Sequence, residues 1–545
     1  MRIAQALPHK SFRNGVSALP PAVRRPDLLL FLLIAAVYLC FPTKNYYWDG
    51  IAFAQAIEAA PQIHPSLVHP NHLIYNLVGY VFYRALQLVG FNLRAVTALQ
   101  ILNAFCSALT AVLLFRILRS TLRSIYYAIT LTLLFAFSAT WWRFTTDADA
   151  YIPSILVLLL SFSFALPQRN PKPVLVAVLY AISLCLHQMA ILFFPILVVA
   201  IFIQNDALIR KRRLINCLLF TVIAGGLTLG AYIFSFYLLT GAFDAGKFWR
   251  WTLSYSPDEN FAFRPWINLG FTLREHSRLF FGGRLNAISG LINPFIVLLI
   301  IAWVGLFLTL TVKVVRSIRN PGRAWLKAIK QDTVRRKLAL ICLLWTFVYL
   351  IVLYLYIPHH AFYRLFYLPA LIILLGLVLD SYQLVTGSSR KYRLAMFVAL
   401  FAITNFLTVI FPSAHVEKYP PLALALEMNK VWPRNTVVYF DSANSDNSLV
   451  KYFNEGTIWK KLELEHAEQL EQDLRAAKAA GANTWLETSA IDQLTASSAG
   501  SEWLKQHIKA NSQRALITKA HNIRFVQVGP AGEREENPLG TVRGR

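Results

Sequence analysis

Charged residues are scarce in this chain of 545 residues. They make up 15% of the sequence, while hydrophobic residues make up 56%. Soluble domains carry about 25% charged residues, so this composition excludes an ordinary soluble protein. Apolar runs close to the length that crosses a bilayer, about 20 residues, recur along the chain. The shortage of charge therefore predicts a multi-pass membrane protein.

Cysteine is also rare, and its spacing excludes a disulfide framework. No two cysteines form a C-x-x-C pair, and all lie in or at the edge of apolar runs. We interpret them as small packing residues: Cys40, Cys106, Cys185, Cys217 and Cys342. Residues 1–26 likewise lack the short apolar core and small-residue cleavage site of a signal peptide. Residues 1–27 are therefore expected to form a basic cytoplasmic N-terminus.

Acidic residues are in the minority, with 28 Asp and Glu against 53 Lys and Arg, and the net charge is +25. In a soluble chain this excess could indicate nucleic-acid binding. Here the basic residues cluster in short loops between apolar runs, which is typical of cytoplasmic loops. The loop Lys313–Lys337 is the strongest example, with nine Lys or Arg and one Asp. The charge therefore predicts topology and argues against a nucleic-acid partner.

The apolar runs predict an all-α polytopic domain over residues 28–412, with about eleven transmembrane helices and additional outer interfacial helices. His72–Gly90 has a broad polar face and is expected to lie at the outer interface without crossing. No broken span and no repeated halves are evident in the sequence. The expected spans are Leu28–Phe41, Ala95–Phe115, Ile125–Trp142, Tyr151–Leu166, Val174–His187, Met189–Ile203, Ile215–Leu239, Ile288–Val312, Leu338–Tyr356, Phe366–Leu379 and Leu394–Phe411.

Residues 413–529 differ, because the apolar runs shorten and helical and strand patterns alternate. We predict a small α/β domain on the outer side of the membrane. Its expected helix is Ala467–Ala480, which ends at Gly481. Its expected strands are Val437–Phe440, Thr484–Leu486 and Ile523–Val528. Residues 530–545 are predicted to form a disordered tail.

The first outer loop, Asn45–Tyr75, contains an Asp, a Glu and three His close to the predicted membrane face. Ionisable groups at such depth are costly and are usually functional. A carboxylate suits a general base that takes a proton from an acceptor hydroxyl, and Asp49 is our candidate. W-D-G before an apolar helix is equally typical of a helix cap, and spacing alone leaves both interpretations open.

A second acidic pair, Asp147-Ala-Asp149, lies in the next predicted outer loop. In an extended segment, alternate residues point the same way, so both carboxylates could bind one cation or act in catalysis. Capping of the following helix is the alternative, and Pro153 is consistent with a helix start. We also consider a divalent metal (Mg, Mn or Zn) on Asp49 and Asp149, or no cofactor at all.

Further polar side chains converge on the same predicted face from distant segments. His187 lies at an outer hairpin, where the alternative is a buried core histidine. His360, Tyr363 and Arg364 precede a late span, and Arg364 could instead reach lipid headgroups. His69 and His72 lack the regular spacing of a zinc site.

These segments together resemble the GT-C superfamily, which includes protein O-mannosyltransferases and the aminoarabinose transferase of lipid A. The resemblance covers about residues 28–412, in order. It rests on the following stretches: W-D-G, H-P-N-H-L-I-Y, L-V-G-F-N-L-R-A-V-T-A-L-Q, T-T-D-A-D-A-Y-I-P, L-C-L-H-Q-M-A-I-L-F-F-P and F-Y-R-L-F-Y-L-P-A. Asn71 replaces the second Pro of the family's H-P-P-x-x-x-Y motif, and Gly50 stands where some members have Glu.

The resemblance implies an integral membrane glycosyltransferase that uses polyprenyl-phosphate sugars, with an inverting reaction expected by analogy with glycosidases. It implies that Asp49 is the first-loop catalytic acid and that Asp147 or Asp149 is the second-loop acid. His69, His72 and Tyr75 would belong to the motif after the first loop, and Arg364 would lie near the donor phosphate. The departures leave open the sugar, the metal dependence, and whether the acceptor is a glycan, a lipid or a protein.

The expected location is the inner cell membrane, with the catalytic face and the C-terminal domain on the periplasmic side. The sequence leaves two alternatives. A transporter or flippase of lipid-linked saccharides would also need many spans and outer polar groups. A transferase of the O-antigen-ligase type would more often have its large outer loop late in the chain, whereas the acids here come early.

Overall fold

A computed structural model describes residues 26–167, 170–254, 263–282, 298, 301–302, 304–305, 308–309, 312, 332–386, 391–431, 435–440, 447–454, 456–461, 467–496, 498–517 and 522–529. The chain divides into two compact units. The first contains residues 1–43 and 56–412, and the second contains residues 44–55 and 413–545. The predicted basic N-terminus and the predicted tail 530–545 lie outside the described residues.

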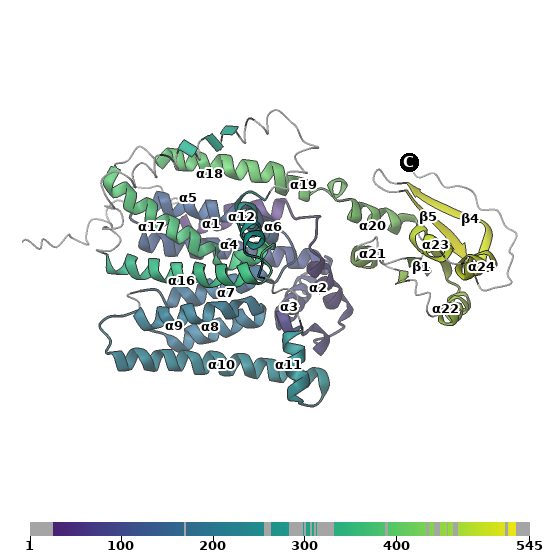
Figure 1. Ribbon diagram of the computed structural model, residues 1–545, viewed down its shortest axis with the longest axis horizontal. Helices are drawn as coiled ribbons and strands as arrows, with labels where there is room; N and C mark the ends of the chain where they lie inside the picture. Colours follow the sequence, from purple (N-terminus) through teal and green to yellow (C-terminus); the bar gives the residue numbers. More distant parts are fainter. Residues whose placement is uncertain are drawn as a thin grey trace, which may run out of the picture. The chain divides into compact units, whose positions relative to one another are not determined.

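The first unit is a helical bundle (Figure 1). Its helices are α1 (Pro26–Cys40), α2 (Trp48–Ala59, which begins in the second unit), α3 (Tyr75–Leu88), α4 (Ala95–Thr121), α5 (Ile125–Ala136), α6 (Ala139–Thr145), α7 (Tyr151–Phe164), α8 (Pro173–Leu186), α9 (Phe194–Ile203), α10 (Arg210–Thr240), α11 (Ala245–Leu253), α12 (Pro265–Phe281), α16 (Thr333–Leu355), α17 (Leu368–Thr386), α18 (Lys391–Asn405) and α19 (Phe411–Ser413, across the unit boundary). Shorter turns are η2 (Pro65–Leu67), η3 (Pro70–His72), η4 (Gln188–Phe193), η6 (Phe362–Tyr367) and the π-helical η7 (Phe406–Ile410).

Among the described residues, five helical segments are long and apolar enough to cross a membrane, or six if one bent pair is a single span. Four shorter apolar segments of 10–17 residues accompany them, so the protein is a multi-pass membrane protein. The large apolar side chains on the outside of α10 and α16 fit a lipid environment. Eleven spans stay a prediction, and the expected span Ile288–Val312 falls mostly outside the described residues.

The expected span Ile125–Trp142 is broken, contrary to the sequence interpretation. Helices α5 and α6 meet at 66° across Phe137 and Ser138. Side chains from elsewhere in the unit bind the backbone freed by the bend: Asn405 Nδ2 donates to Phe137 O at 2.8 Å, and Tyr38 Oη donates to Ala136 O at 2.8 Å. Polar partners of this kind allow a helix to break within a membrane domain. The bend points α6 toward the Asp147–Asp149 loop.

Helix α3 is amphipathic and falls outside the spans detected by length and hydropathy. It packs closely on α4 at Gly79, where a Cβ atom would lie 2.6 Å from Leu99 Cδ2 and 2.9 Å from Ile57 Cδ1. Glu58 joins the end of α2 to the start of α4, because its carboxylate pairs with Arg94 at 2.9 Å and accepts from Ala95 N at 2.7 Å. These contacts fix the helices that carry the candidate site.

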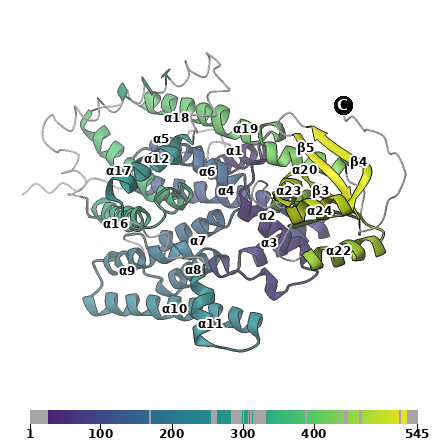
Figure 2. The same ribbon diagram turned by 45° about the vertical axis from the view of Figure 1, so that its right-hand side comes forward.

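The second unit contains a five-stranded sheet in the order β2-β1-β3-β5-β4. Strands β1, β2 and β3 are parallel, and β5 is antiparallel to both β3 and β4. Figure 2 shows this sheet with α23 and α24 against it. Its elements are η8 (Val416–Lys418), α20 (Pro420–Val431), β1 (Thr436–Phe440), α21 (Asn447–Phe453), β2 (Thr457–Lys461), α22 (Ala467–Ala479), β3 (Asn483–Glu487), α23 (Thr488–Thr495), α24 (Ser498–His507), β4 (Ile508–Ile517) and β5 (Asn522–Val528).

The core of the second unit joins β1 and β3 to the helices α22, α23 and α24 through Val437, Leu474, Leu486, Leu494 and Leu504. The three expected strands coincide with β1, β3 and β5, and the expected helix coincides with α22. Strands β2 and β4 were not predicted. The segment Lys44–Gln55 also belongs to this unit, a grouping that the sequence did not predict, and Gln55 Nε2 donates to Ser448 O at 3.3 Å.

Candidate active site

The loop between α6 and α7 contains Asp147 and Asp149, and two amide side chains of α4 hold its backbone. Asn103 Nδ2 donates to the carbonyls of both Asp147 and Asp149, each at 2.8 Å. One turn earlier, Gln100 Nε2 donates to Thr146 O at 2.9 Å. Both amides are buried. These hydrogen bonds fix the backbone of the loop on α4, and the backbone in turn sets the positions of the two aspartates.

The two carboxylates of this loop are buried, with 2% of Asp147 and 1% of Asp149 exposed. Asp147 Oδ1 accepts from Ala148 N at 2.8 Å, and Asp149 Oδ1 accepts from Tyr151 N at 3.0 Å. The bond to Tyr151 N lies at the start of α7, as expected for the capping alternative. This bond uses only one oxygen of the Asp149 carboxylate, so capping does not exclude a catalytic role, and that role stays a prediction.

Tyr75, at the start of α3, reaches the same loop. Burial, followed by the nearby carboxylates of Asp149 and Asp147, raises the pKa of Tyr75 well above its ordinary value. The phenol therefore stays protonated beside two acids, and it is placed to donate a hydrogen bond.

Three histidines lie in a row next to this loop. The ring of His72 is 5.6 Å from that of His69 and 4.6 Å from that of His187, centroid to centroid. Burial, together with the neighbouring His69, lowers the pKa of His72 to about 3. Burial also lowers the pKa of His69, so His69 and His72 both favour the neutral form.

His187 occupies the junction of α8 and η4, as the predicted hairpin requires. Its Nδ1 accepts from Met189 N at 3.0 Å, so the neutral ring carries its proton on Nε2. Nε2 is buried and has no hydrogen-bond partner among the described residues. An unpaired buried donor is costly, which makes this atom a point where a ligand would gain a contact.

The aromatic ring of Tyr151 lies at the centre of the predicted residues. Its centroid is 4.4 Å from that of His187, 5.7 Å from that of Tyr363 and 6.4 Å from that of His72. His360 continues the group, 6.0 Å from Tyr363. The fold thus brings His69, His72, Tyr75, Asp147, Asp149, His187, His360 and Tyr363 into one region of the first unit. The sequence had treated Tyr151 only as a helix start.

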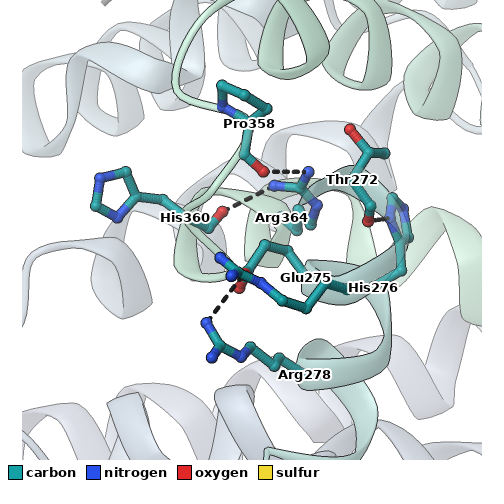
Figure 3. A network of polar contacts seen from close by, with 8 residues as sticks. Thr272, Glu275, His276, Arg278, Pro358, His360 and Arg364 are labelled. Atoms are coloured by element: carbon teal, nitrogen blue, oxygen red, sulfur yellow. Dashed lines mark hydrogen bonds and ion pairs between the residues drawn. The ribbon is translucent and has the colours of Figure 1, made fainter. Parts of the chain in front are cut away.

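Arg364 binds backbone carbonyls of the segment that precedes it (Figure 3). It is fully buried, and its Nη1 and Nη2 donate to the carbonyls of His360 and Pro358 at 2.8 and 3.0 Å. Figure 3 also shows that the imidazole of His360 turns away from the guanidinium. Arg364 therefore stays inside the protein rather than reaching lipid headgroups. Its Nε is buried without a partner among the described residues, and the contact with a donor phosphate stays a prediction.

A second polar network, which the sequence did not reveal, lies on α12. Glu275 is 1% exposed, and its Oε1 accepts from Arg274 Nε at 2.6 Å and from Arg278 Nη1 at 2.9 Å. His276 Nδ1 donates to Thr272 O at 2.7 Å, and its Nε2 accepts from Tyr367 Oη at 2.7 Å. The Arg-Glu-His-x-Arg spacing was the available signal, because it places charges on an otherwise amphipathic helix.

Asp49 lies in the first turn of α2 and is half-buried. It belongs to the second unit, whereas the other predicted acids belong to the first. Within the described part of the chain, no group of three or more His, Cys, Asp or Glu side chains could hold a metal ion. The proposed Asp49 and Asp149 metal ligands thus gain no further support.

Comparisons with known proteins were made at the level of sequence and of structure. No protein-family model matches the chain, and no curated protein matches it. ArnT from Cupriavidus metallidurans bound to undecaprenyl phosphate is similar in structure, with a TM-score of 0.56 and 12% identity over 92% of this chain and 98% of that chain. Its apo form gives a TM-score of 0.56 and 13% identity over 93% and 98%.

The chain has the GT-C fold. The resemblance stated from the sequence motifs is therefore confirmed at the level of the fold. An oligosaccharyltransferase from Archaeoglobus fulgidus gives a TM-score of 0.41 with 11% identity, over 92% of this chain and 73% of that chain. That likeness is too low to support an argument about this chain.

Proposed function

We propose that this protein is a membrane glycosyltransferase that moves a sugar from a polyprenyl-phosphate donor to a hydroxyl group of an acceptor. The observation that supports this most strongly is the convergence of buried acids, histidines and tyrosines on one region of a GT-C fold. The similar ArnT structure contains undecaprenyl phosphate, the class of lipid that such a donor needs. The reacting groups are proposed to lie on the periplasmic side of the inner membrane.

Asp49 is proposed as the general base that takes the proton from the acceptor hydroxyl. Attack on the far face of the anomeric carbon would invert its configuration, and the sugar–phosphate bond would break with the electron pair staying on the lipid phosphate. A half-buried carboxylate at the start of a helix is accessible to an acceptor, which fits this role. Asp147 and Asp149 are proposed as further acids of the reaction.

The histidine and tyrosine side chains around Tyr151 are proposed to bind substrate. Neutral imidazoles and phenols are suited to hydroxyl groups of a sugar, because they donate and accept hydrogen bonds without adding charge. The unpaired Nε2 of His187 is the clearest donor. The departing phosphate needs a cation, and Arg364 is proposed for this role, as the resemblance implies.

The experiment is a membrane assay with lipid-linked donor extracted from cells that lack this protein, where such a donor should accumulate. Asp49→Asn should lower transfer by about 100-fold or more, because removal of a general base costs roughly this much. Glu58→Gln is the matched control on the same helix, since Glu58 binds Arg94 and Ala95 N and should affect stability instead. Normal product yield from Asp49→Asn would remove the base assignment.

A further inference from the structure

Helix α11 is a short amphipathic helix directly after the long membrane helix α10. Helix α10 ends at Gly241, which has a φ of +71° and turns the chain. Asp244 then caps α11, because its carboxylate accepts from Lys247 N at 2.7 Å. Figure 1 shows α11 at the end of α10. A helix that begins just where a membrane helix stops is placed at the level of the lipid headgroups.

One side of α11 is fixed to the protein. Phe248 is 2% exposed and packs on Phe236, with ring centroids 5.6 Å apart. The carbonyl of Thr252 accepts from Gln188 Nε2 at 3.0 Å, and the same nitrogen donates to Pro70 O at 3.0 Å. Helix α11 is therefore attached to η3 and η4, the turns that carry His72 and His187.

The opposite side of α11 has two distinct flanks. With about 100° between successive residues, Trp249 and Leu253 fall on one flank, and Arg250 and Lys247 fall on the other. Trp249 is 55% exposed and Leu253 57% exposed. Lys247 and Arg250 are exposed too, and neither side chain has a hydrogen bond or ion pair to the described residues.

This pattern matches the chemistry of a membrane surface that contains anionic lipid. Tryptophan is enriched at the boundary between acyl chains and headgroups, and Lys or Arg beside it can reach phosphate. The end of α10 that precedes α11 also exposes large apolar side chains, among them Phe234, Tyr237 and Leu238, as expected if one bilayer covers both helices. The two unpaired cations supply the complementary charge.

We propose that α11 is an interfacial anchor that binds anionic phospholipid headgroups through Lys247 and Arg250, while Trp249 and Leu253 insert among the upper acyl chains. The partner is the bilayer itself. Because α11 is bonded to η3 and η4, the lipid at this surface also supports the turns that carry two histidines of the candidate site. The proposal stands on the surface of α11 and does not depend on a transferase activity.

The experiment uses the full-length protein in nanodiscs of phosphatidylcholine mixed with phosphatidylglycerol, with retained lipids counted by native mass spectrometry. The double variant Lys247→Gln/Arg250→Gln should lower the retained ratio of phosphatidylglycerol to phosphatidylcholine by roughly 25-fold, since each of the two basic residues near an anionic surface contributes about fivefold. The charge-matched control is Lys418→Gln/Lys430→Gln in the second unit, which should leave the ratio unchanged. An equal drop in both variants, or in neither, overturns the assignment.

A second measurement tests the depth of α11. The fluorescence of Trp249, obtained as the difference between the wild type and Trp249→Phe, should be quenched by lipids brominated near the headgroup end of the acyl chain. It should be protected from iodide in the aqueous phase. Quenching of this component by iodide and not by brominated lipid would place α11 in water and contradict the proposal.

Discussion

Two buried polar clusters of the first unit differ in how their groups are paired. The α12 network consists of Thr272, Arg274, Glu275, His276 and Arg278, with Arg364 beside it. Its charged groups meet partners at 2.6–3.0 Å, although Arg364 Nε and Thr272 Oγ1 are buried without a partner among the described residues. The acid-loop cluster consists of His72, Asp147, Asp149, Tyr151 and His187. Its backbone is held by Asn103, but the Nε2 of His187 has no partner among the described residues.

The difference indicates that the two clusters have different roles, one in stability and the other in binding. A carboxylate shared by two guanidinium groups, or a guanidinium on two carbonyls, stabilises one arrangement and offers little to a substrate. A fixed loop with acids, neutral histidines and an unpaired donor has the features of a ligand-binding site. We therefore expect changes in the acid-loop cluster to affect activity, and changes in the α12 network to affect stability.

The largest expected effect is that of Asp149→Asn on activity. Asparagine keeps the oxygen that accepts from Tyr151 N, so the start of α7 should survive while the negative charge is lost. Transfer should fall by about 100-fold, with the thermal midpoint near that of the wild type. Both are measured on purified protein, in the donor assay and by thermal unfolding.

Asp27→Asn is the control for loss of a carboxylate in the same unit, because Asp27 pairs with Arg116 at a partly exposed position. Its activity should stay within about twofold of the wild type. If Asp149→Asn lowers the thermal midpoint while the activity per folded molecule stays at the wild-type level, the two clusters do not differ in the way proposed.

Glu275→Gln should have the next largest effect, on stability. The substitution removes the carboxylate charge shared by Arg274 and Arg278 and leaves a neutral amide at a buried position. The expected loss is about 2 kcal/mol of unfolding free energy, below the full cost of breaking a buried pair because both arginines are partly exposed. Thermal unfolding measures it, with activity per folded molecule reported alongside.

The control for Glu275→Gln is Glu427→Gln in the second unit. Glu427 pairs with Lys430 on an exposed surface, so its removal should change stability by less than about 1 kcal/mol. If Glu275→Gln lowers activity without lowering the thermal midpoint, the α12 network takes part in the reaction and its proposed structural role is wrong.

The smallest expected effect concerns pH. The folded pKa of His72 is about 3, below its ordinary value, because burial and His69 disfavour the charged ring. The unfolded chain therefore takes up a proton near pH 6.5, and stability is lost as the pH falls from there toward 3. At pH 5 this loss is about 2 kcal/mol at most, and less where water enters the site.

The measurement is the thermal midpoint of the wild type and of His72→Phe between pH 7 and pH 5. Phenylalanine keeps a flat ring against His187 and Tyr151 but does not titrate. The variant should show a shallower decline in midpoint. Parallel declines in the two proteins would mean that His72 is not held neutral, and that the acid-loop cluster is more open than its burial indicates.

Much of the secondary structure could be predicted, because it depends on local pattern. The run Val174–His187 reads as an apolar helix and matches α8 (Pro173–Leu186), with His187 at its end. Strands β1, β3 and β5 have apolar, β-branched or aromatic residues between turn signals. Strand β4 was missed since its sequence, I-K-A-N-S-Q-R-A-L-I, lacks this alternation and its pairing with β5 determines it.

The break between α5 and α6 could not be predicted for a different reason. Ile125–Trp142 contains neither Pro nor Gly, and Ser138, whose Oγ donates to Phe135 O at 2.8 Å, is only a weak local signal of a break. The bend is stabilised by Asn405 and Tyr38, which lie far away in the sequence. The α12 network was missed in part for the same reason, because His276 meets its partner Tyr367, which is distant in sequence, only when η6 packs near α12.

The sequence by itself determined that this protein is a membrane protein, because its apolar runs are long enough to cross a bilayer. The basic residues in the short loops between these runs are typical of cytoplasmic loops. The sequence also determined which side chains had chemistry to offer, since few polar groups occur among the apolar runs. Only the tertiary structure decided which of them meet. Packing placed Tyr151 among the histidines, joined His276 to Tyr367, and grouped Asp49 with the second unit, because contacts between distant segments are set by the shape of the whole fold.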